Sequence, residues 1–278
     1  MKVLLVDGHN LLFQMYFGMP SRIVNKSGRA IQGTLGFVGA LLRMIRMTSP
    51  THAAVLFDGE HENPRAQLDA GYKANREDFR DAEESPFDQL PDICEALDYL
   101  GIRHTEVAEG ETDDAMAAYV HTLRDKAEIV IASQDSDFFQ LIRPNVQVLR
   151  YRGELSRLCG EEWLNEKYGV RPEQYADFKS LTGDGSDNIP GVPGIGSVTA
   201  ARLLRQFGSL DELLTRMDDI SRPTLREAIR THADRLQLNR RLITLDGGCP
   251  LPIPAEEMAW SDREITSTQV LTAIGLKP

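Results

Sequence analysis

Residues 2–7 read KVLLVD, a continuous apolar run that ends in an aspartate. The same pattern returns at AAVLFD (53–58) and at IVIASQDSD (129–137). Short continuous apolar runs are typical of strands that are buried on both faces of a parallel sheet. We therefore predict three such strands, each of which delivers a carboxylate at its carboxyl end.

Stretches with helical apolar spacing separate and follow these strands, at 35–47, 86–100, 113–123, 161–168, 172–181 and 197–207. Strands that alternate with helices predict an α/β fold in which a central, mostly parallel sheet is flanked by helices. Beyond residue 151 the pattern is helical only. We expect three parts: an α/β core (1–160) that carries a polar insertion at about 60–85, an all-α subdomain (161–246) and a C-terminal extension (247–278).

Composition narrows the class of protein. Apolar residues make up 41% of the chain and charged residues 26%, which is typical of a globular protein. No apolar run is long enough to span a membrane, and the first residues do not form a signal peptide. Three scattered cysteines (Cys94, Cys159 and Cys249) fit a reducing cytoplasm. The net charge of −11 does not by itself predict binding to a polyanion.

Nine acidic residues stand out because they follow strands, begin a helix or lie in a glycine-rich turn. They are Asp7, Asp58, Glu111, Asp113, Asp114, Asp135, Asp137, Asp184 and Asp187. Singly, each could be a helix cap or a turn residue. Together they would repel one another at one sheet edge, and stability alone gives no reason to collect them. Two Mg²⁺ or Mn²⁺ ions would make this arrangement favourable, as in enzymes that cleave phosphodiesters.

Six segments stand in a fixed order along the chain: LLVDGHNLL (4–12), VLFDG (55–59), YKANR (72–76), EGETDDAMA (109–117), SQDSDFFQL (133–141) and LTGDGSDNIPGVPGIGSVTA (181–200). In combination they resemble the flap endonuclease family of structure-specific 5′-nucleases, in particular bacterial 5′→3′ exonucleases like the N-terminal domain of DNA polymerase I. The resemblance covers residues 1–245. It implies a PIN-like 5′-nuclease core followed by a helix–hairpin–helix subdomain.

The resemblance also implies roles for individual residues. All nine acids match the two metal sites of the family, although Thr112 stands where alanine is usual. Lys73 and Arg76 match the basic pair that holds the scissile phosphate, and Tyr72 is a candidate for stacking on a base. The insertion would be an arch or clamp around the 5′ strand. Between Glu62 and Glu84, however, it holds four basic and seven acidic residues, so bulk charge does not favour a grip on DNA there.

The glycine-rich turn and the helix after it resemble the hairpin of a helix–hairpin–helix, which would contact duplex backbone and bind K⁺. The candidate DNA-binding residues are Gly191, Val192, Gly194, Ile195, Gly196, Ser197, Arg202 and Arg205. Residues 197–243 hold nine arginines against six acids, a local charge of +3.

The function implied is metal-dependent 5′→3′ exonuclease and flap endonuclease activity in replication and repair. Its substrates would be DNA with a 5′ flap, nick or overhang and RNA–DNA primer junctions, handled by a cytoplasmic, nucleoid-associated monomer. Three alternatives stay open at this point. They are a PIN-type ribonuclease, a non-catalytic binder of branched DNA, and a phosphatase that uses Asp7 as its nucleophile.

Overall fold

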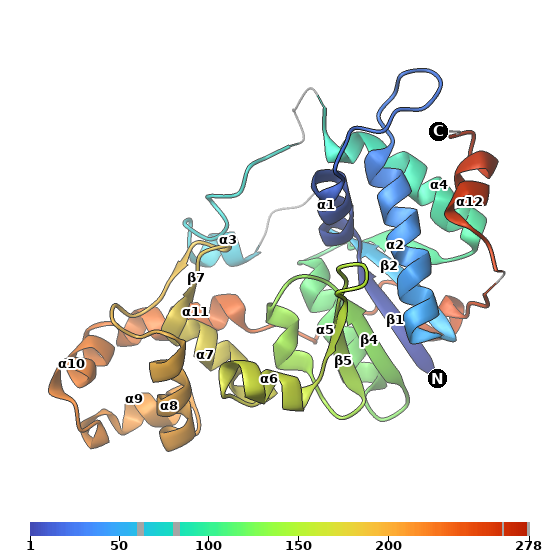
Figure 1. Cartoon of the computed structure of the whole chain (residues 1–278). Helices are drawn as coiled ribbons and strands as arrows, with labels where there is room; N and C mark the ends of the chain where they lie inside the picture. The colour runs from blue at the N-terminus through green and yellow to red at the C-terminus, as the bar shows by residue number, and fades with distance from the viewer. Residues whose placement is uncertain (60–63, 80–83, 263, 277–278) are drawn as a thin grey trace.

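The computed structural model describes residues 1–59, 64–79, 84–262 and 264–276. Its centre is a six-stranded sheet with the strand order β3-β2-β1-β4-β5-β6 (Figure 1). The first five strands are parallel and β6 is antiparallel to β5. The strands are β1 (Lys2–Asp7), β2 (His52–Phe57), β3 (Arg103–Glu106), β4 (Glu128–Ala132), β5 (Val146–Arg150) and β6 (Arg157–Cys159). The prediction of a mostly parallel sheet is confirmed.

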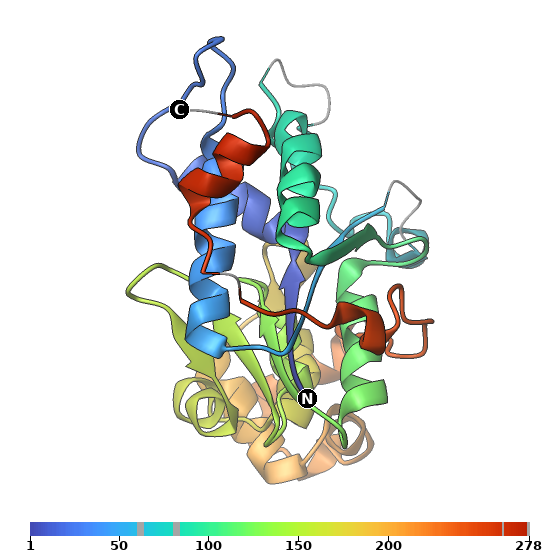
Figure 2. The ribbon, with the colours of Figure 1, turned by 90° about the vertical axis from the view of Figure 1, so that its right-hand side faces the viewer.

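Both faces of the sheet are covered because its strands are apolar on both sides. In β1, Val3 and Leu5 belong to one buried cluster and Leu4 and Val6 to the other. Helices α1, α2, α4 and α12 pack on the face of Leu4, and α5 lies on the opposite face (Figures 1 and 2). These helices are α1 (Gly8–Gly18), α2 (Gln32–Thr48), α4 (Leu90–Leu100), α5 (Thr112–Leu123) and α12 (Ser267–Ala273).

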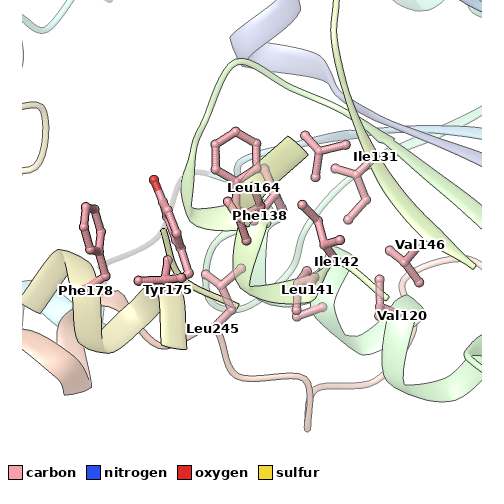
Figure 3. Packing of buried hydrophobic residues seen from close by; sticks show 14 of the residues in the cluster. Val120, Ile131, Phe138, Leu141, Ile142, Val146, Leu164, Tyr175, Phe178 and Leu245 are labelled. Atoms are coloured by element: carbon pink, nitrogen blue, oxygen red, sulfur yellow. The ribbon is translucent and has the colours of Figure 1, made fainter. Parts of the chain in front are cut away.

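The helical part continues from the core without a break in packing. Its helices are α6 (Glu161–Tyr168), α7 (Tyr175–Thr182), α8 (Ser197–Phe207), α9 (Leu210–Thr215), α10 (Pro223–Thr231) and α11 (Ala233–Ile243). Figure 3 shows Phe138 and Ile142, which follow β4, in the same apolar cluster as Leu164 of α6 and Tyr175 of α7. The two parts therefore share one hydrophobic core, so the helical part is held firmly against the sheet.

The prediction missed β3, β5 and β6, and for β3 and β6 there is a physical reason. β3 has the sequence RHTE and lies at the edge of the sheet, where one side is open to water and no apolar run is needed. β6 is only three residues long, and two of the three are exposed. Short 3₁₀ turns also replace the first turns of two expected helices, at Pro86–Gln89 and Pro172–Gln174.

The C-terminal extension returns to the core. Ala259 forms an antiparallel bridge with His52 at the start of β2, and the Trp260 amide donates to the Thr51 carbonyl at 2.9 Å. Helix α12 then packs against α2 and α4 (Figure 2). Of the helices in the described ranges, none combines the length and the apolar composition that crossing a bilayer requires.

The turn between α7 and α8 depends on two glycines whose backbones are in contact. A Cβ on Gly191 would lie 2.3 Å from the carbonyl carbon and oxygen of Thr182, and one on Gly183 would lie 2.4 Å from the Gly191 nitrogen. Gly183 also has a φ of +79°, a conformation that favours glycine. The small strands β7 (Gly183–Asp184) and β8 (Ile189–Pro190) pair at this point.

We predict that Gly191→Ala lowers the free energy of unfolding by about 1–3 kcal/mol, because the added methyl group overlaps backbone atoms that have no room to move. Urea denaturation measures this change. The matched control is Gly185→Ala, since a methyl group added to Gly185 would have no neighbouring atom within 4 Å and the φ of this residue is not positive. Equal stability of both variants would contradict the predicted overlap.

Candidate metal-dependent nuclease site

The carboxyl ends of the parallel strands open into one cavity of about 1270 Å³. Five of the nine acids singled out from the sequence line it, and we call them the first carboxylate group: Asp7, Asp58, Glu111, Asp113 and Asp135. They come from the ends of β1, β2 and β4 and from the start of α5. Strand order brings these side chains together, because β2, β1 and β4 are neighbours in the sheet.

Asp7 is held in place by two hydrogen bonds. Its Oδ1 accepts a hydrogen bond from the Asn10 amide at 3.1 Å, which caps α1, and its Oδ2 accepts from the Ser133 hydroxyl at 2.8 Å. Burial and the negative charges of Asp58 and Asp135 raise the pKa of Asp7 to about 7. Without a cation, the ionised form of this carboxyl is therefore unfavourable near neutral pH.

Asp113 differs from its neighbours in the first carboxylate group. Among the described residues it has no hydrogen bond and no ion pair, although it lines the cavity beside Asp135 and Asp7. Burial and the charge of Asp135 hold its pKa well above the ordinary value. A half-buried carboxylate without a partner is costly, so this side chain is available to a cation.

Glu111 and Asp58 are held by donors instead. Burial alone would raise the pKa of Glu111, but Lys73 and Arg65 lower it, and the Arg65 guanidinium lies 2.5 Å from its Oε2. Lys73 forms a second ion pair with Glu111. The Oδ1 of Asp58 accepts the Thr112 amide at 2.9 Å, so the first turn of α5 is attached to the end of β2.

Three further acids, Asp137, Asp184 and Asp187, form the second carboxylate group. One carboxylate oxygen from each lies within 4.8 Å of the others. Asp135 links the two groups, because its Oδ1 accepts the Asp137 amide at 2.8 Å. Burial raises the pKa of Asp137 to about 7, even though the ammonium of Lys179 lowers it.

Asp114 has a different position from the other eight acids. Its two oxygens accept from both terminal nitrogens of Arg65 at 2.7 Å, and Oδ1 also accepts the Asp246 amide at 2.7 Å. Arg65 in addition donates to the Thr244 carbonyl at 3.1 Å. Asp114 thus binds α3 (Pro64–Leu68) to the segment that follows α11, and it does not line the cavity.

The YKANR and GDGSDN motifs hold each other in place. The Lys73 amide donates to the Asp187 carbonyl at 3.0 Å, and the Asn188 side chain donates to the Gly71 carbonyl at 2.8 Å. Lys73 has a φ of +55°, a conformation that side chains rarely adopt and that this contact supports. Arg76 pairs with Asp187 at 2.6 Å. Lys73 and Arg76 both line the cavity, together with the first carboxylate group.

Tyr72 is largely buried in this structure. Its side chain is buried in a small cluster with Ile189, Leu242 and Ile243, and its hydroxyl donates to Glu111 at 3.1 Å. The ring thus packs at the base of the insertion, and its stacking on a base stays a prediction. Residues 60–63 and 80–83 of the expected arch or clamp lie outside the described residues.

Several residues of the site were not singled out from the sequence. The aromatic rings of His9, Phe13, Phe79 and Phe87 line the cavity, and Phe13 contacts both Phe79 and Phe87 edge to face, with centroids 5.7 and 5.4 Å apart. Arg65 and Lys179 were also missed. In the sequence, each of these two residues is simply a basic residue in a short helical stretch. Exposed lysines and arginines show the same pattern, so the sequence could not mark these two as part of the site.

The candidate DNA-binding residues lie between α7 and α8 and on α8. The side chains of Val192 and Ile195 are buried in the main core, so a ligand could reach these two residues only through their backbones. Gly191 is needed for the close packing of this turn. Gly194, Gly196 and Ser197 form the exposed turn and the start of α8, and among the described residues Arg202 and Arg205 on that helix have no ion pair.

The residues present fit a hard divalent cation. The first carboxylate group offers oxygen ligands only, and Asp113 has no other partner in the described part of the chain. Oxygen-rich sites of this kind suit Mg²⁺ or Mn²⁺. Acids collected at the carboxyl edge of a parallel sheet, faced by Lys73 and Arg76, define a class of protein: nucleases that hydrolyse phosphodiesters with the help of metal ions.

Comparison with known proteins agrees with this class. Residues 2–169 match the model of the 5′-3′ exonuclease N-terminal resolvase-like domain, and residues 170–266 match that of the 5′-3′ exonuclease C-terminal SAM fold. The chain belongs to the 5′-3′ exonuclease family. It is a nuclease of that family, as its motifs implied.

Two groups of relatives are informative. The chain is 37% identical over 272 residues to thermostable DNA polymerase I of Thermus thermophilus, and the match covers 95% of this chain and 31% of that protein. It is 33% identical over 258 residues to DNA polymerase I of Bacillus subtilis, and this match covers 91% of this chain and 28% of that protein. The chain thus spans about a third of the length of these polymerases. Its fold is similar to that of T5 5′-exonuclease with zinc bound, with a TM-score of 0.73 and 22% identity over 88% of this chain and 90% of that chain. It is also similar to the Rad2 catalytic core with DNA, with a TM-score of 0.62 and 15% identity over 98% of this chain and 84% of that chain.

We predict that Asp7→Asn stabilises the metal-free protein at neutral pH but not in acid. The folded-state pKa of Asp7, about 7, lies above its ordinary value of 3.8, so the folded state retains a proton that the unfolded state releases. This contribution to stability is complete below about pH 4 and is lost as the pH rises towards 7. An asparagine avoids that loss, can still accept from the Asn10 amide and can donate to the Ser133 hydroxyl.

In EDTA at pH 8 the variant should therefore exceed the parent by more than about 1 kcal/mol in free energy of unfolding. The two proteins should be equally stable near pH 4. Urea denaturation across this pH range measures the difference. A difference that does not change with pH would refute the assigned shift.

Proposed function

We propose that this chain hydrolyses phosphodiester bonds near the 5′ ends of flapped, nicked or overhanging DNA, with Mg²⁺ or Mn²⁺ at the two carboxylate groups. The single observation that supports this proposal most strongly is the composition of the cavity. Carboxylates for metal ions, two basic side chains for a phosphate and aromatic rings for bases all line the same space. Family membership supports the reaction, and the geometry of the cavity supports the substrate class.

Each side chain contributes in a way that follows from its position. Lys73 and Arg76 lie on one turn held to the Asp187 loop, so they can bind a phosphate without losing their orientation. Asp7, Asp113 and Asp135 would hold one divalent ion, and Asp137, Asp184 and Asp187 a second. When bound, such ions supply a nucleophilic water at neutral pH and stabilise negative charge at the phosphate.

The aromatic residues indicate that unpaired nucleotides enter the cavity. Phe13, Phe79 and Phe87 form a continuous group next to the first carboxylate group. Aromatic rings stack on unpaired bases of any sequence, and bases in an intact duplex are not available to them. The cavity therefore favours a junction between duplex and single strand over continuous duplex.

The helical hairpin would bind the duplex on the other side of that junction. The exposed turn at Gly194 and Gly196 leads into α8, where backbone amides are available to a phosphate. Arg202 and Arg205 extend from the same helix. A K⁺ ion bound by the backbone of this turn would add positive charge. These contacts read no base sequence, which suits an enzyme that recognises the shape of a junction.

We further propose that the protein acts as a monomer in the bacterial cytoplasm, close to the nucleoid. Its role would be to remove RNA primers or displaced flaps during replication and repair. Similarity to DNA polymerase I supports this role, since the Thermus thermophilus protein includes a region like almost the whole of this chain.

The experiment that tests the function compares end-labelled DNA flaps, nicked duplexes, blunt duplexes and RNA strands as substrates, with Mg²⁺ or EDTA and with or without K⁺. Short products released from 5′ ends of flaps and nicks, only with Mg²⁺, are expected. Preference for RNA would favour a PIN-type ribonuclease. Binding without any cleavage would favour a non-catalytic binder of branched DNA, and release of inorganic phosphate alone would favour a phosphatase.

We predict that Asp135→Asn reduces flap cleavage at least about 100-fold, because Asp135 lies between the two carboxylate groups and would serve the metal ions of both. Duplex binding, measured by fluorescence anisotropy in Ca²⁺, should survive. The matched control is Asp125→Asn, since Asp125 is 85% exposed and lies in a turn after α5. Full cleavage by the Asp135 variant would refute the metal site.

We predict that Phe13→Ala weakens binding of flapped DNA by about 1–3 kcal/mol, the free energy of one base stacked on an aromatic ring. Binding of blunt duplex should not change. Phe13→Leu keeps the apolar volume and should bind flaps as weakly as the alanine variant. Tyr99→Ala, which removes an exposed aromatic residue of α4, is the control. If the leucine variant binds flaps like the parent, the ring packs the cavity wall and does not stack.

A further inference from the structure

Lys179 is a buried lysine in the middle of the second carboxylate group. It lies on α7 between Phe178 and Ser180, and its exposure is 5%. Its ammonium forms ion pairs with both Asp137 and Asp184. The third acid of the group, Asp187, pairs with Arg76 at 2.6 Å. Each carboxylate of the second group thus already has a cationic partner from this chain.

The first carboxylate group is different. Among the described residues, Asp7, Asp113 and Asp135 have no ion pair, and Asp113 has no hydrogen bond either. Within the described part of the chain, no basic side chain forms an ion pair with these three carboxylates, whereas in the second group every carboxylate has one. The two groups therefore differ in what a divalent ion would encounter on arrival.

The space in the second group is small. One oxygen from each of its three carboxylates lies within 4.8 Å of the others, which is room for one cation. Lys179 already contacts two of these three residues. A divalent ion at the same carboxylates would face the ammonium at close range, and two cations there repel strongly because the site is shielded from water. The ammonium of Lys179 therefore opposes the binding of a metal ion at these carboxylates.

We propose that Lys179 is a resident cation that competes with the divalent ion for the second carboxylate group. The protein then binds one divalent ion readily at the first group. It binds a second ion only when the ammonium of Lys179 leaves Asp137 and Asp184. This inference rests on the proposed function in one respect, that the two groups hold divalent ions, and it assigns Lys179 the control of when the second one binds.

A simpler role for Lys179 is to neutralise buried acids so that the chain folds. Removal of the ammonium would then lower stability in the absence of metal, and our proposal expects the same effect. The two roles differ in the presence of metal ions. A purely structural lysine stays on Asp137 and Asp184 when metal is added, and a competing lysine is displaced.

The test is a titration of the full chain with Mn²⁺ by calorimetry, comparing the parent with Lys179→Met. The parent should bind one Mn²⁺ tightly and a second at least 10-fold more weakly. In the methionine variant the second dissociation constant should fall at least 10-fold, and the first should stay as in the parent. Lys167→Met, which removes a lysine that packs over the Trp163 ring on α6, is the matched control and should behave as the parent. A second dissociation constant that stays the same or rises in Lys179→Met overturns the proposal.

A measurement on the parent alone covers the case in which Lys179→Met does not fold. Brief acetylation with acetic anhydride, read by mass spectrometry, should label Lys179 at least 5-fold faster in saturating Mn²⁺ than in EDTA. Labelling of Lys167 should not change. Equal labelling of Lys179 in both conditions overturns the proposal. Neither readout involves DNA, so absence of flap cleavage would reject the proposed function and leave the competition between lysine and metal as measured.

Discussion

Repulsion between like charges is the constraint on which this structure depends. The fold collects the eight carboxylates of the two groups at the carboxyl edge of one sheet, and burial removes much of the water that would screen them. The chain offsets this repulsion unevenly. Arg65 and Lys73 hold Glu111, while Lys179 and Arg76 hold the second carboxylate group. Asp7, Asp113 and Asp135 have no ion pair within the described part of the chain. A divalent cation bound beside these three carboxylates would therefore be stabilised most.

The same cations also connect the parts of the molecule. Arg65 reaches from α3 to Asp114 on α5 and to the backbone after α11, so the base of the insertion is fixed to the sheet domain and to the helical part together. Lys73 and Arg76 are attached to the Asp187 loop, which begins the turn towards α8. Residues that would bind a phosphate are thereby coupled to the residues that would bind metal ions and duplex.

Much of the fold and part of the site could be predicted from the sequence. The runs that begin at Val3, Ala53 and Ile129 were long and apolar enough to identify three central strands, because a strand buried on both faces needs apolar residues at every position. The edge strand β3 was missed because it is only partly buried. The positions of Asp7, Asp58 and Asp135 followed from the strand ends. The burial of Tyr72 could not be predicted, since an aromatic residue beside a lysine has the same sequence pattern whether it is buried or exposed.

The sequence by itself determined the fold class, the family and the set of acidic residues, since these depend on periodicity and on the order of motifs along the chain. Only the tertiary structure decided which of these acids form the first carboxylate group, which form the second, and which lie outside both. In the folded chain Asp114 pairs with Arg65 and does not line the cavity. Asp113 has no partner among the described residues, and Lys179 lies among the acids of the second group. Ion pairs between residues far apart in the chain depend on packing and on the direction of each side chain, and neither leaves a local pattern in the sequence.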